Sequence, residues 1–432
     1  MTPTETSMAE VLPDSPEELI PTSRQLGRYT LRYRVARGGM ASVFLAQLLG
    51  DAGFAKWVAV KVVHPHIATD PHFAQMFLDE ARLAAQLQHP NLCTVFDFGN
   101  KDGSLFLAME YLHGESLASV AVSAWRDGAM PMELSARIVA DAARGLHAAH
   151  ELRREDGSDA KVVHRDVSPQ NLFVLYDGVT KVVDFGIARW TDRLGESTGN
   201  GTLKGKVAYM APEQLRGGAI DRRADLWALG VVLWECLVGR RLFKRSVDAA
   251  TLMAVLNEPA PAPSAHRPEV PEALDRVCLR ALSRDPEGRF PTALELARSL
   301  EAWLATGGQT TGSDEVGAWM QARFAERMAY RDKLLRAPTG PVQLVERWMD
   351  PTGSHRALSD VDAPEAPAQP PAPRYPGDAP ERSEVQARAV VPRPPIRTTR
   401  WDRVAPWLAA FAGLLVLLVL ALALGPWRGG TP

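Results

Sequence analysis

Hydrophobic and polar positions change their period along the N-terminal part of the chain. Residues 28–36 (RYTLRYRVA) and 57–63 (WVAVKVV) are rich in β-branched and aromatic side chains, which is typical of strands. Residues 71–88 instead repeat apolar side chains with the helical period of about 3.6 residues. The apolar positions of this helix are Phe73, Met76, Phe77, Leu83, Ala84 and Leu87. The pattern predicts strands followed by an amphipathic helix.

Two charged residues interrupt these apolar patterns. Lys61 lies inside the apolar strand from Trp57 to Val63, and Glu80 falls on the apolar face of the helix over 71–88. A buried charge is costly unless it is paired. Each side chain therefore either reaches water at the edge of its element or binds the other. We favour an ion pair, because the helix that carries Glu80 follows the strand that carries Lys61.

The longest apolar run lies near the C-terminus. No residue from Val404 to Trp427 is charged, and residues 405–425 are nearly all apolar. At about 1.5 Å per residue, such a helix spans a hydrocarbon core of about 30 Å. The alternative is a core helix of a globular domain, but a proline-rich segment precedes the run and offers nothing to bury it. The pattern predicts a transmembrane helix over 404–427.

The middle of the chain carries residues suited to phosphoryl transfer. In HRDVSPQN (164–171), Asp166 is an acid that can accept the proton of a hydroxyl group. Asn171 and Asp184, the latter in VVDFG (182–186), offer oxygen ligands for magnesium on ATP. Upstream, Gly38 and Gly39 fall in RGGMASVF (37–44), a turn whose backbone amides can cover phosphates; an ordinary hairpin turn is the alternative.

The order of these motifs resembles that of bacterial eukaryotic-like (Hanks-type) serine/threonine protein kinases, of the kind abundant in myxobacteria. The resemblance covers residues 28–305 and includes YMAPEQ (209–214) and DLWALG (225–230). It implies a two-lobed α+β fold, with a small β-rich lobe and a large helical lobe. It also implies a structural pair between Glu213 and Arg289.

The resemblance implies a role for each matching residue. Asp166 would position or deprotonate the acceptor hydroxyl, and Lys61, held by Glu80, would orient the phosphates of ATP. Asn171 and Asp184 would bind Mg²⁺. In LFLAMEYLHGESL (105–117), Met109 would be the gatekeeper, and backbone groups of Glu110 and Leu112 would hold adenine. The complete nucleotide-binding set would be Ala36, Arg37, Gly38, Gly39, Met40, Val43, Ala59, Lys61, Met109, Glu110, Leu112 and Asp184.

The chain departs from the family pattern at four positions. Ala36 and Ala41 replace the first and third glycines of the phosphate loop, which leaves a backbone cradle only if their φ angles are negative. Ser168 stands where serine/threonine kinases usually carry a lysine that touches the γ-phosphate, and Lys206 stands where they usually carry a threonine. We predict that Lys206 supplies the missing cation and is a further catalytic residue; a solvated Lys206 in a slower enzyme is the alternative.

The segment between Asp184 and Glu213 is rich in Gly, Ser, Thr and charged residues, which is typical of a mobile loop. Thr202 lies where the family's main activating phosphate sits, and Arg165 could receive that phosphate. Thr198 is a second candidate for regulatory phosphorylation.

Composition narrows the class further. The 432 residues are 46% hydrophobic, enough for a sizeable core, and the net charge of −2 implies no attraction to nucleic acid. Only three cysteines occur, Cys93, Cys236 and Cys278, and their wide spacing fits a reducing compartment rather than a disulfide framework.

The remaining segments complete the expected domain organisation. We expect a disordered acidic leader over 1–27, a helical extension over 306–336 and a disordered juxtamembrane linker over 337–403. The helix over 314–336 is expected to pack on the large lobe, with a dimer contact as the alternative. Its apolar face comprises Val316, Trp319, Met320, Phe324 and Met328.

Charge predicts the orientation of the membrane span. Arginines are more numerous before the apolar run than after it, which keeps the kinase domain in the cytoplasm, at the inner membrane, and leaves residues 428–432 as a short extracytoplasmic tail. The arginines before the run are Arg388, Arg393, Arg397, Arg400 and Arg403, against Arg428 beyond it.

The sequence therefore predicts a membrane-tethered kinase that transfers the γ-phosphoryl group of Mg-ATP to protein serine or threonine hydroxyls. Expected partners are protein substrates, the membrane and other copies of the chain, for autophosphorylation between neighbours. A weak pseudokinase acting as a membrane scaffold stays open because of Ala36, Ala41 and Ser168. A kinase of small molecules is disfavoured by the long segment before YMAPEQ (209–214).

Overall fold

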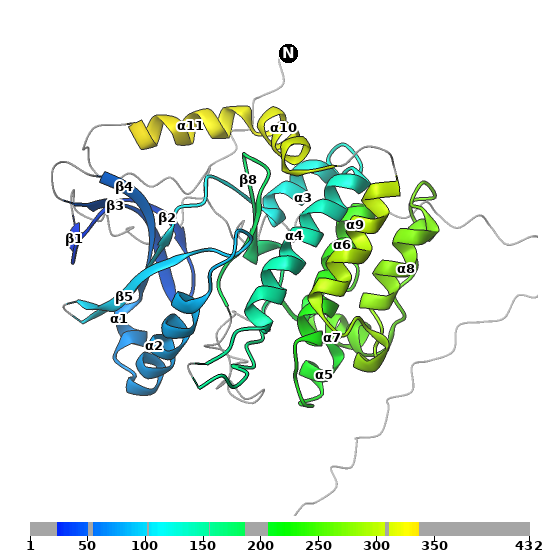
Figure 1. Cartoon of the computed structure of the whole chain (residues 1–432), viewed down its shortest axis with the longest axis horizontal. Helices are drawn as coiled ribbons and strands as arrows, with labels where there is room; N and C mark the ends of the chain where they lie inside the picture. Colours follow the sequence, from blue (N-terminus) through cyan, green and yellow to red (C-terminus); the bar gives the residue numbers. More distant parts are fainter. Residues whose placement is uncertain are drawn as a thin grey trace, which may run out of the picture. The chain divides into compact units, whose positions relative to one another are not determined.

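The computed structural model describes residues 24–50, 55–101, 103–154, 156–185, 206–306 and 311–336 (Figure 1). Within these ranges a small β-rich lobe is followed by a large helical lobe, which agrees with the expected two-lobed α+β fold. Predictions for Thr198, Thr202, the linker and the span over 404–427 lie outside the described residues. Among those described, no helix has both the length and the apolar character that a membrane crossing requires.

The small lobe is built on an antiparallel sheet. Six described strands follow the order β1-β2-β3-β4-β6-β5. Their bounds are Arg24–Leu26 (β1), Tyr29–Arg37 (β2), Ala41–Leu49 (β3), Ala55–Val63 (β4), Val95–Lys101 (β5) and Ser104–Glu110 (β6). The leader predicted over 1–27 is therefore wrong at its end, because Arg24–Leu26 turns at Gly27, whose φ is +59°, and pairs with β2.

Helix α2 (Pro71–Gln86) packs on this sheet after the short helix α1 (Pro65–Ala68). It begins where the side chain of Asp70 accepts hydrogen bonds from the amides of His72 and Phe73, which satisfies two of the donors that a helix start leaves unpaired. Phe77 joins Val63 and Leu105 in a buried cluster. The helix ends two residues earlier than the periodicity predicts, because Leu87 is extended.

The large lobe is centred on three long helices, α4 (Met132–His150), α6 (Arg223–Val238) and α9 (Ala293–Thr306) (Figure 1). Helix α6 is apolar on all sides, so it lies in the interior of the lobe. Its Trp227 and Trp234 are almost fully buried. The surrounding helices are α3 (Leu117–Trp125), α5 (Pro212–Leu215), α7 (Asp248–Asn257) and α8 (Glu272–Ala281).

A small second sheet lies where the lobes join. Its order is β7-β8-β9, with strands Gly114–Ser116, Leu172–Leu175 and Thr180–Val182. Residues 164–171 lead into β8, and β9 leads to Asp184. This sheet therefore brings the two predicted acidic motifs to one place.

The C-terminal extension forms two helices rather than one. Helix α10 (Ser313–Arg323) and helix α11 (Ala325–Arg336) meet at Phe324, whose backbone leaves the helical region. Val316, Met320 and Phe324 are buried in the core of the large lobe, as their spacing predicts. Helix α11 instead reaches the small lobe (Figure 1).

Candidate active site

The loop over 164–171 is held by a buried carboxylate. Asp225 at the start of α6 accepts hydrogen bonds from the amides of His164 and Arg165 at 2.8 and 2.7 Å. Its Oδ2 also lies 2.8 Å from Nε2 of His150. Burial raises the pKa of Asp225, but these hydrogen bonds and the nearby His150 and His164 outweigh burial and lower the pKa below its ordinary value. The Asp225 side chain is therefore ionised, and its carboxylate holds the loop in place.

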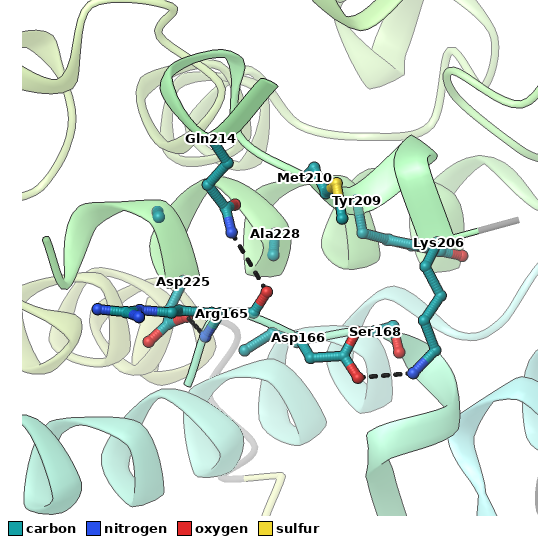
Figure 2. A pocket seen from close by; sticks show the side chains of 11 residues that line it. Arg165, Asp166, Ser168, Lys206, Tyr209, Met210, Gln214, Asp225 and Ala228 are labelled. Atoms are coloured by element: carbon teal, nitrogen blue, oxygen red, sulfur yellow. Dashed lines mark hydrogen bonds and ion pairs between the residues drawn. The ribbon is translucent and has the colours of Figure 1, made fainter. Parts of the chain in front are cut away.

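Two residues of the site have left-handed backbones. Arg165 has φ of +63° and Asp184 has φ of +53°, a region that residues other than glycine rarely adopt. Such conformations persist only where the surroundings enforce them. Besides Asp225, the side-chain amide of Gln214 donates to the Arg165 carbonyl at 3.3 Å (Figure 2). Strained backbone therefore occurs in both acidic motifs, at Arg165 directly before Asp166 and at Asp184 itself.

Asp166 is bound by an amide and by an ammonium group. Nδ2 of Asn171 donates to the Asp166 carbonyl at 2.8 Å and to its Oδ2 at 3.0 Å. Nζ of Lys206 lies 2.6 Å from the same Oδ2, and Figure 2 shows this side chain reaching across Ser168 to the acid. Ser168 is buried and uncharged, so Lys206 provides a cation at Asp166 that Ser168 cannot.

Lys61 reaches the second acidic motif. Its Nζ donates to Oδ1 of Asp184 at 2.9 Å. Burial raises the pKa of Asp184, but the Lys61 ammonium, together with Lys206 and His164, outweighs burial and lowers the pKa below its ordinary value. The backbone of Glu80 lies in α2, but its side chain is outside the described part, so the ion pair with Lys61 stays a prediction.

Asn171 and Asp184 carry the oxygens expected to bind magnesium. The Val183 amide donates to the Asn171 carbonyl at 3.0 Å, which places the two segments side by side. Because the Asn171 Nδ2 atom donates to Asp166, its amide oxygen points elsewhere. A carboxylate and an amide oxygen are the donors that Mg²⁺ takes in proteins, so these residues fit the ion.

Four of the predicted nucleotide-binding residues share one face of the small-lobe sheet. Val43 pairs with Lys61 across β3 and β4, and Ala59 pairs with Met109 across β4 and β6. Side chains directly opposite each other in neighbouring strands lie on the same face. Arg37, at the end of β2, and Met40, just before β3, are exposed.

The phosphate loop keeps an ordinary backbone despite its two alanines. Among the described residues, the non-glycine residues with positive φ are Lys161, Arg165 and Asp184, so Ala36 and Ala41 satisfy the condition for a backbone cradle. The amide of Gly38 donates to the Ala41 carbonyl at 2.8 Å, which closes the turn.

The side chain of Glu110 holds the segment after β6, although only the backbone of Glu110 was predicted to have a role. Its Oε1 lies 2.5 Å from Nζ of Lys181 on β9, and its Oε2 accepts from the Thr94 amide at 3.2 Å. Leu112, the other expected adenine partner, accepts a hydrogen bond from the Gly114 amide at 3.0 Å through its carbonyl. The hinge over 110–114 is thus tied to both lobes.

The expected structural pair is also present in the large lobe. Nη1 and Nη2 of Arg289 donate to the two carboxylate oxygens of Glu213 at 2.7 and 2.8 Å. The Arg289 side chain is fully buried and donates to three carbonyls as well. The pair joins the segment after Lys206 to the helical core.

Comparison with known proteins decides the family. The family model described as the protein kinase domain matches residues 29–299. The chain belongs to the protein kinase family. A crystal structure of the Mycobacterium tuberculosis PknI kinase domain superposes with a TM-score of 0.50 at 29% identity, covering 67% of this chain and 100% of that chain.

Curated relatives are bacterial kinases. Tyrosine-protein kinase MasK of Myxococcus xanthus is 44% identical over 316 residues, which cover 73% of this chain and 49% of MasK. Serine/threonine-protein kinase PknE of Mycobacterium tuberculosis is 34% identical over 328 residues, which cover 76% of this chain and 53% of PknE. The chain thus spans about half the length of these two relatives.

Membership of the protein kinase family implies ATP and a divalent cation in general terms. The sequence correctly predicted that Lys61, Asp166, Asn171 and Asp184 lie at this site. The groups that hold the site in place could not be predicted, since their partners lie far away in the sequence. These groups are His150, Lys181, Gln214 and Asp225.

Proposed function

We propose that this kinase transfers the γ-phosphoryl group of Mg-ATP to serine and threonine hydroxyls of proteins, including its own. The observation that carries the proposal is the cluster around Asp166, where Asn171 and Lys206 orient one acid beside the motif of Asp184. Asp166 would accept or orient the proton of the acceptor hydroxyl. Lys61 would orient the phosphates, and Lys206 would stabilise charge that develops on the transferred group.

A magnesium ion held by Asn171 and Asp184 would neutralise charge on the phosphates. The chain's own residues hold the reacting groups in position. Asp225 and Gln214 fix the backbone of Arg165, and this sets the direction of the Asp166 side chain. Preorganised groups of this kind lower the barrier because they need no rearrangement during the reaction.

Tyrosine is the second candidate acceptor. Lys206 and Ser168 exchange the residue types usual in serine/threonine kinases, and MasK is named a tyrosine-protein kinase whereas PknE is named a serine/threonine-protein kinase. The deciding experiment incubates the full chain with ATP and Mg²⁺ and maps phosphorylated residues by mass spectrometry. Serine and threonine should dominate. Predominant phosphotyrosine would replace the proposed acceptor class, and no incorporation would reject the activity.

Activation by phosphorylation is part of the proposal. A phosphate on Thr202 would carry nearly two negative charges at neutral pH, and Arg165 beside Asp166 is a suitable cation to bind it. Thr198 is the second candidate. The same mapping experiment tests both sites, since active protein should carry phosphate on Thr202.

Localisation at the inner face of a membrane completes the proposal. Its support is the uncharged run over 404–427 and the excess of arginine before it. Tethering by the linker over 337–403 would raise the local concentration of one kinase around another.

A further inference from the structure

Helices α10 and α11 connect the two lobes on the hinge side. Helix α10 is fixed to the large lobe, where Nε2 of Gln321 donates to the Tyr176 carbonyl at 2.8 Å. Nε of Arg323 donates to Oγ of Ser123 at 3.0 Å. Helix α11 then continues to the small lobe and crosses beside its strands (Figure 1). A helix fixed at both lobes can restrict how they move relative to each other.

The C-terminal end of α11 packs on the strands that carry the nucleotide-binding residues. Nε1 of Trp57, on β4, donates to the Leu335 carbonyl at 3.0 Å. Leu334 is 8% exposed and belongs to a cluster that also includes Val43 and hinge residue Tyr111. The other members of this cluster are Tyr33, Val35, Leu45, Trp57, Tyr330 and Leu335. The strands predicted to cover the nucleotide and helix α11 thus pack into one apolar cluster.

The middle of α11 binds the residues that follow the hinge. The carboxylate of Glu115, only 2% exposed, receives Nη2 of Arg331 at 3.1 Å and Nη2 of Arg327 at 3.2 Å. The hydroxyl of Tyr176 donates to the same carboxylate at 2.6 Å. Nη1 of Arg331 also donates to the Gly114 carbonyl. A carboxylate buried this deeply depends on such partners, because an unpaired charge in the interior is costly.

These contacts reach the backbone expected to hold adenine. The Gly114 amide donates to Leu112 at 3.0 Å, while the Gly114 carbonyl accepts from Arg331. Gly114 also lies directly against β8, since a Cβ atom there would come within 2.3 Å of the Val174 carbonyl. Arg331 therefore holds the carbonyl of Gly114, two residues after the expected adenine contact Leu112, although it belongs to a helix outside the matched residues 29–299.

We propose that Arg331 is a positioning residue for nucleotide binding, and that α11 is a clamp that keeps the hinge in its ATP-binding conformation. The inference rests on the proposed use of ATP. If α11 sets the hinge and does not touch the reacting atoms, its loss weakens ATP binding while the turnover rate at saturating ATP changes little.

The test measures the ATP dissociation constant and steady-state kinetics of the full chain carrying Arg331→Ala. The dissociation constant and KM for ATP should rise at least fivefold, with kcat within about twofold of the unchanged protein. Lys333→Ala is the matched control, because it removes an exposed cation from the same helix α11. It should leave both constants within twofold.

Two milder variants keep the test valid if Arg331→Ala does not fold. Arg331→Lys keeps a cation near Glu115 but loses the forked donor, and Trp57→Phe removes the hydrogen bond to Leu335. Both should raise KM for ATP, by less than Arg331→Ala, at unchanged melting temperature to within a few degrees. Folded variants that bind ATP as tightly as the unchanged chain would reject the role of Arg331 and α11 but leave the proposed kinase activity intact. If the unchanged chain itself binds no ATP, both the role of α11 and the proposed function are rejected.

Discussion

Nζ of Lys206 lies 2.6 Å from Oδ2 of Asp166, and both side chains are largely shielded from water. An ion pair at this distance in a poorly solvated site is stronger than the same pair at the surface. This contact supports the prediction that Lys206 supplies the cation that Ser168 cannot. The contact joins the loop over 164–171 to the start of the 3-10 helix η5 (Lys206–Tyr209).

Replacing Lys206 with alanine should slow phosphoryl transfer. We expect at least a tenfold lower kcat, which corresponds to about 1.4 kcal/mol. Ser168→Lys in the Lys206→Ala background should restore part of the rate, since it returns a cation to the same place from the other side. The measurement is initial-rate phosphorylation at saturating ATP.

Lys204→Ala, two residues earlier in the sequence, is the control and should keep the normal rate. A Lys206→Ala enzyme of normal turnover would reject a catalytic role for the ion pair. A lower rate that Ser168→Lys does not improve would assign Lys206 to substrate docking instead.

Asp166 and Lys61 should be indispensable for activity but not for folding. Asp166→Asn removes the acid, and Lys61→Met removes the ammonium next to Asp184. Each variant should lose phosphorylation of itself and of an added protein, with a melting temperature close to that of the unchanged chain. Lys56→Met, at an exposed position of the same strand β4, should retain activity. Normal labelling by both active-site variants would contradict the assignment of the site.

The pair between Arg289 and Glu213 should matter for stability. Breaking a buried ion pair by removing one partner costs about 3 to 5 kcal/mol, because the other charge stays buried. Arg289→Ala should therefore lower the free energy of unfolding by about this amount. Arg276→Ala is the control, since its partner Glu272 and Arg276 itself are mostly exposed. Equal unfolding midpoints for the two variants in urea would contradict the structural role.

The motif residues could be predicted because each lies in a short segment with its own pattern. A lysine within an apolar strand or an acid within HRDVSPQN (164–171) is recognisable locally, and the sheet β7-β8-β9 then brings Asp166 near Asp184. Lys206 could be predicted only by comparison with the family, as the residue exchanged with Ser168. The structure adds its distance to Asp166.

The supporting contacts could not be predicted, since they join residues far apart in the sequence. Asp225 binds backbone amides of the loop about 60 residues earlier, and no pattern marks an amide as its partner. The helix over 325–336 has a weak apolar stripe, because its Arg327 and Arg331 point inward to Glu115. A buried arginine in a polar helix is indistinguishable from a solvated one until its partner is located.

Stability should fall as the pH is lowered below about 6.5, the ordinary pKa of histidine. Burial is the main cause that lowers the pKa of five described histidines, so the folded protein favours their neutral form. Below that pH the unfolded chain binds more protons than the folded protein does. The free energy of unfolding therefore decreases on acidification. These residues are His64, His89, His113, His147 and His266.

His89 offers a direct test of this pH dependence. Burial lowers its pKa first, and Arg144, Lys181 and His147 lower it further. Its Nδ1 accepts a hydrogen bond from the Asn91 amide at 3.1 Å, which protonation of that nitrogen would abolish. His89→Asn keeps an acceptor but cannot titrate, so the drop in melting temperature between pH 7.5 and pH 5.5 should become smaller. The exposed His72→Asn should leave the drop unchanged; a drop equal in both variants would exclude His89 as a contributor.

The final prediction concerns the proposed tether. The roughly 64 residues from 337 to 400 would, as a flexible coil, extend about 40 to 50 Å, and the prolines should increase this reach. Two kinases anchored in one membrane could then meet, so phosphorylation between neighbours should be faster than in solution. Deleting residues 404–432 should release the enzyme from membranes, slow its autophosphorylation and make that reaction depend on bulk concentration.

Activity of the deletion variant toward an added protein substrate should be largely retained, because the described catalytic residues end well before the deleted segment. That retained activity is the internal control, since it separates a loss of proximity from a loss of folding. Recovery of the full-length chain in the soluble fraction of cells would remove the membrane span. Equal autophosphorylation rates with and without the span, in membranes of known protein density, would keep the anchor and reject the effect of proximity.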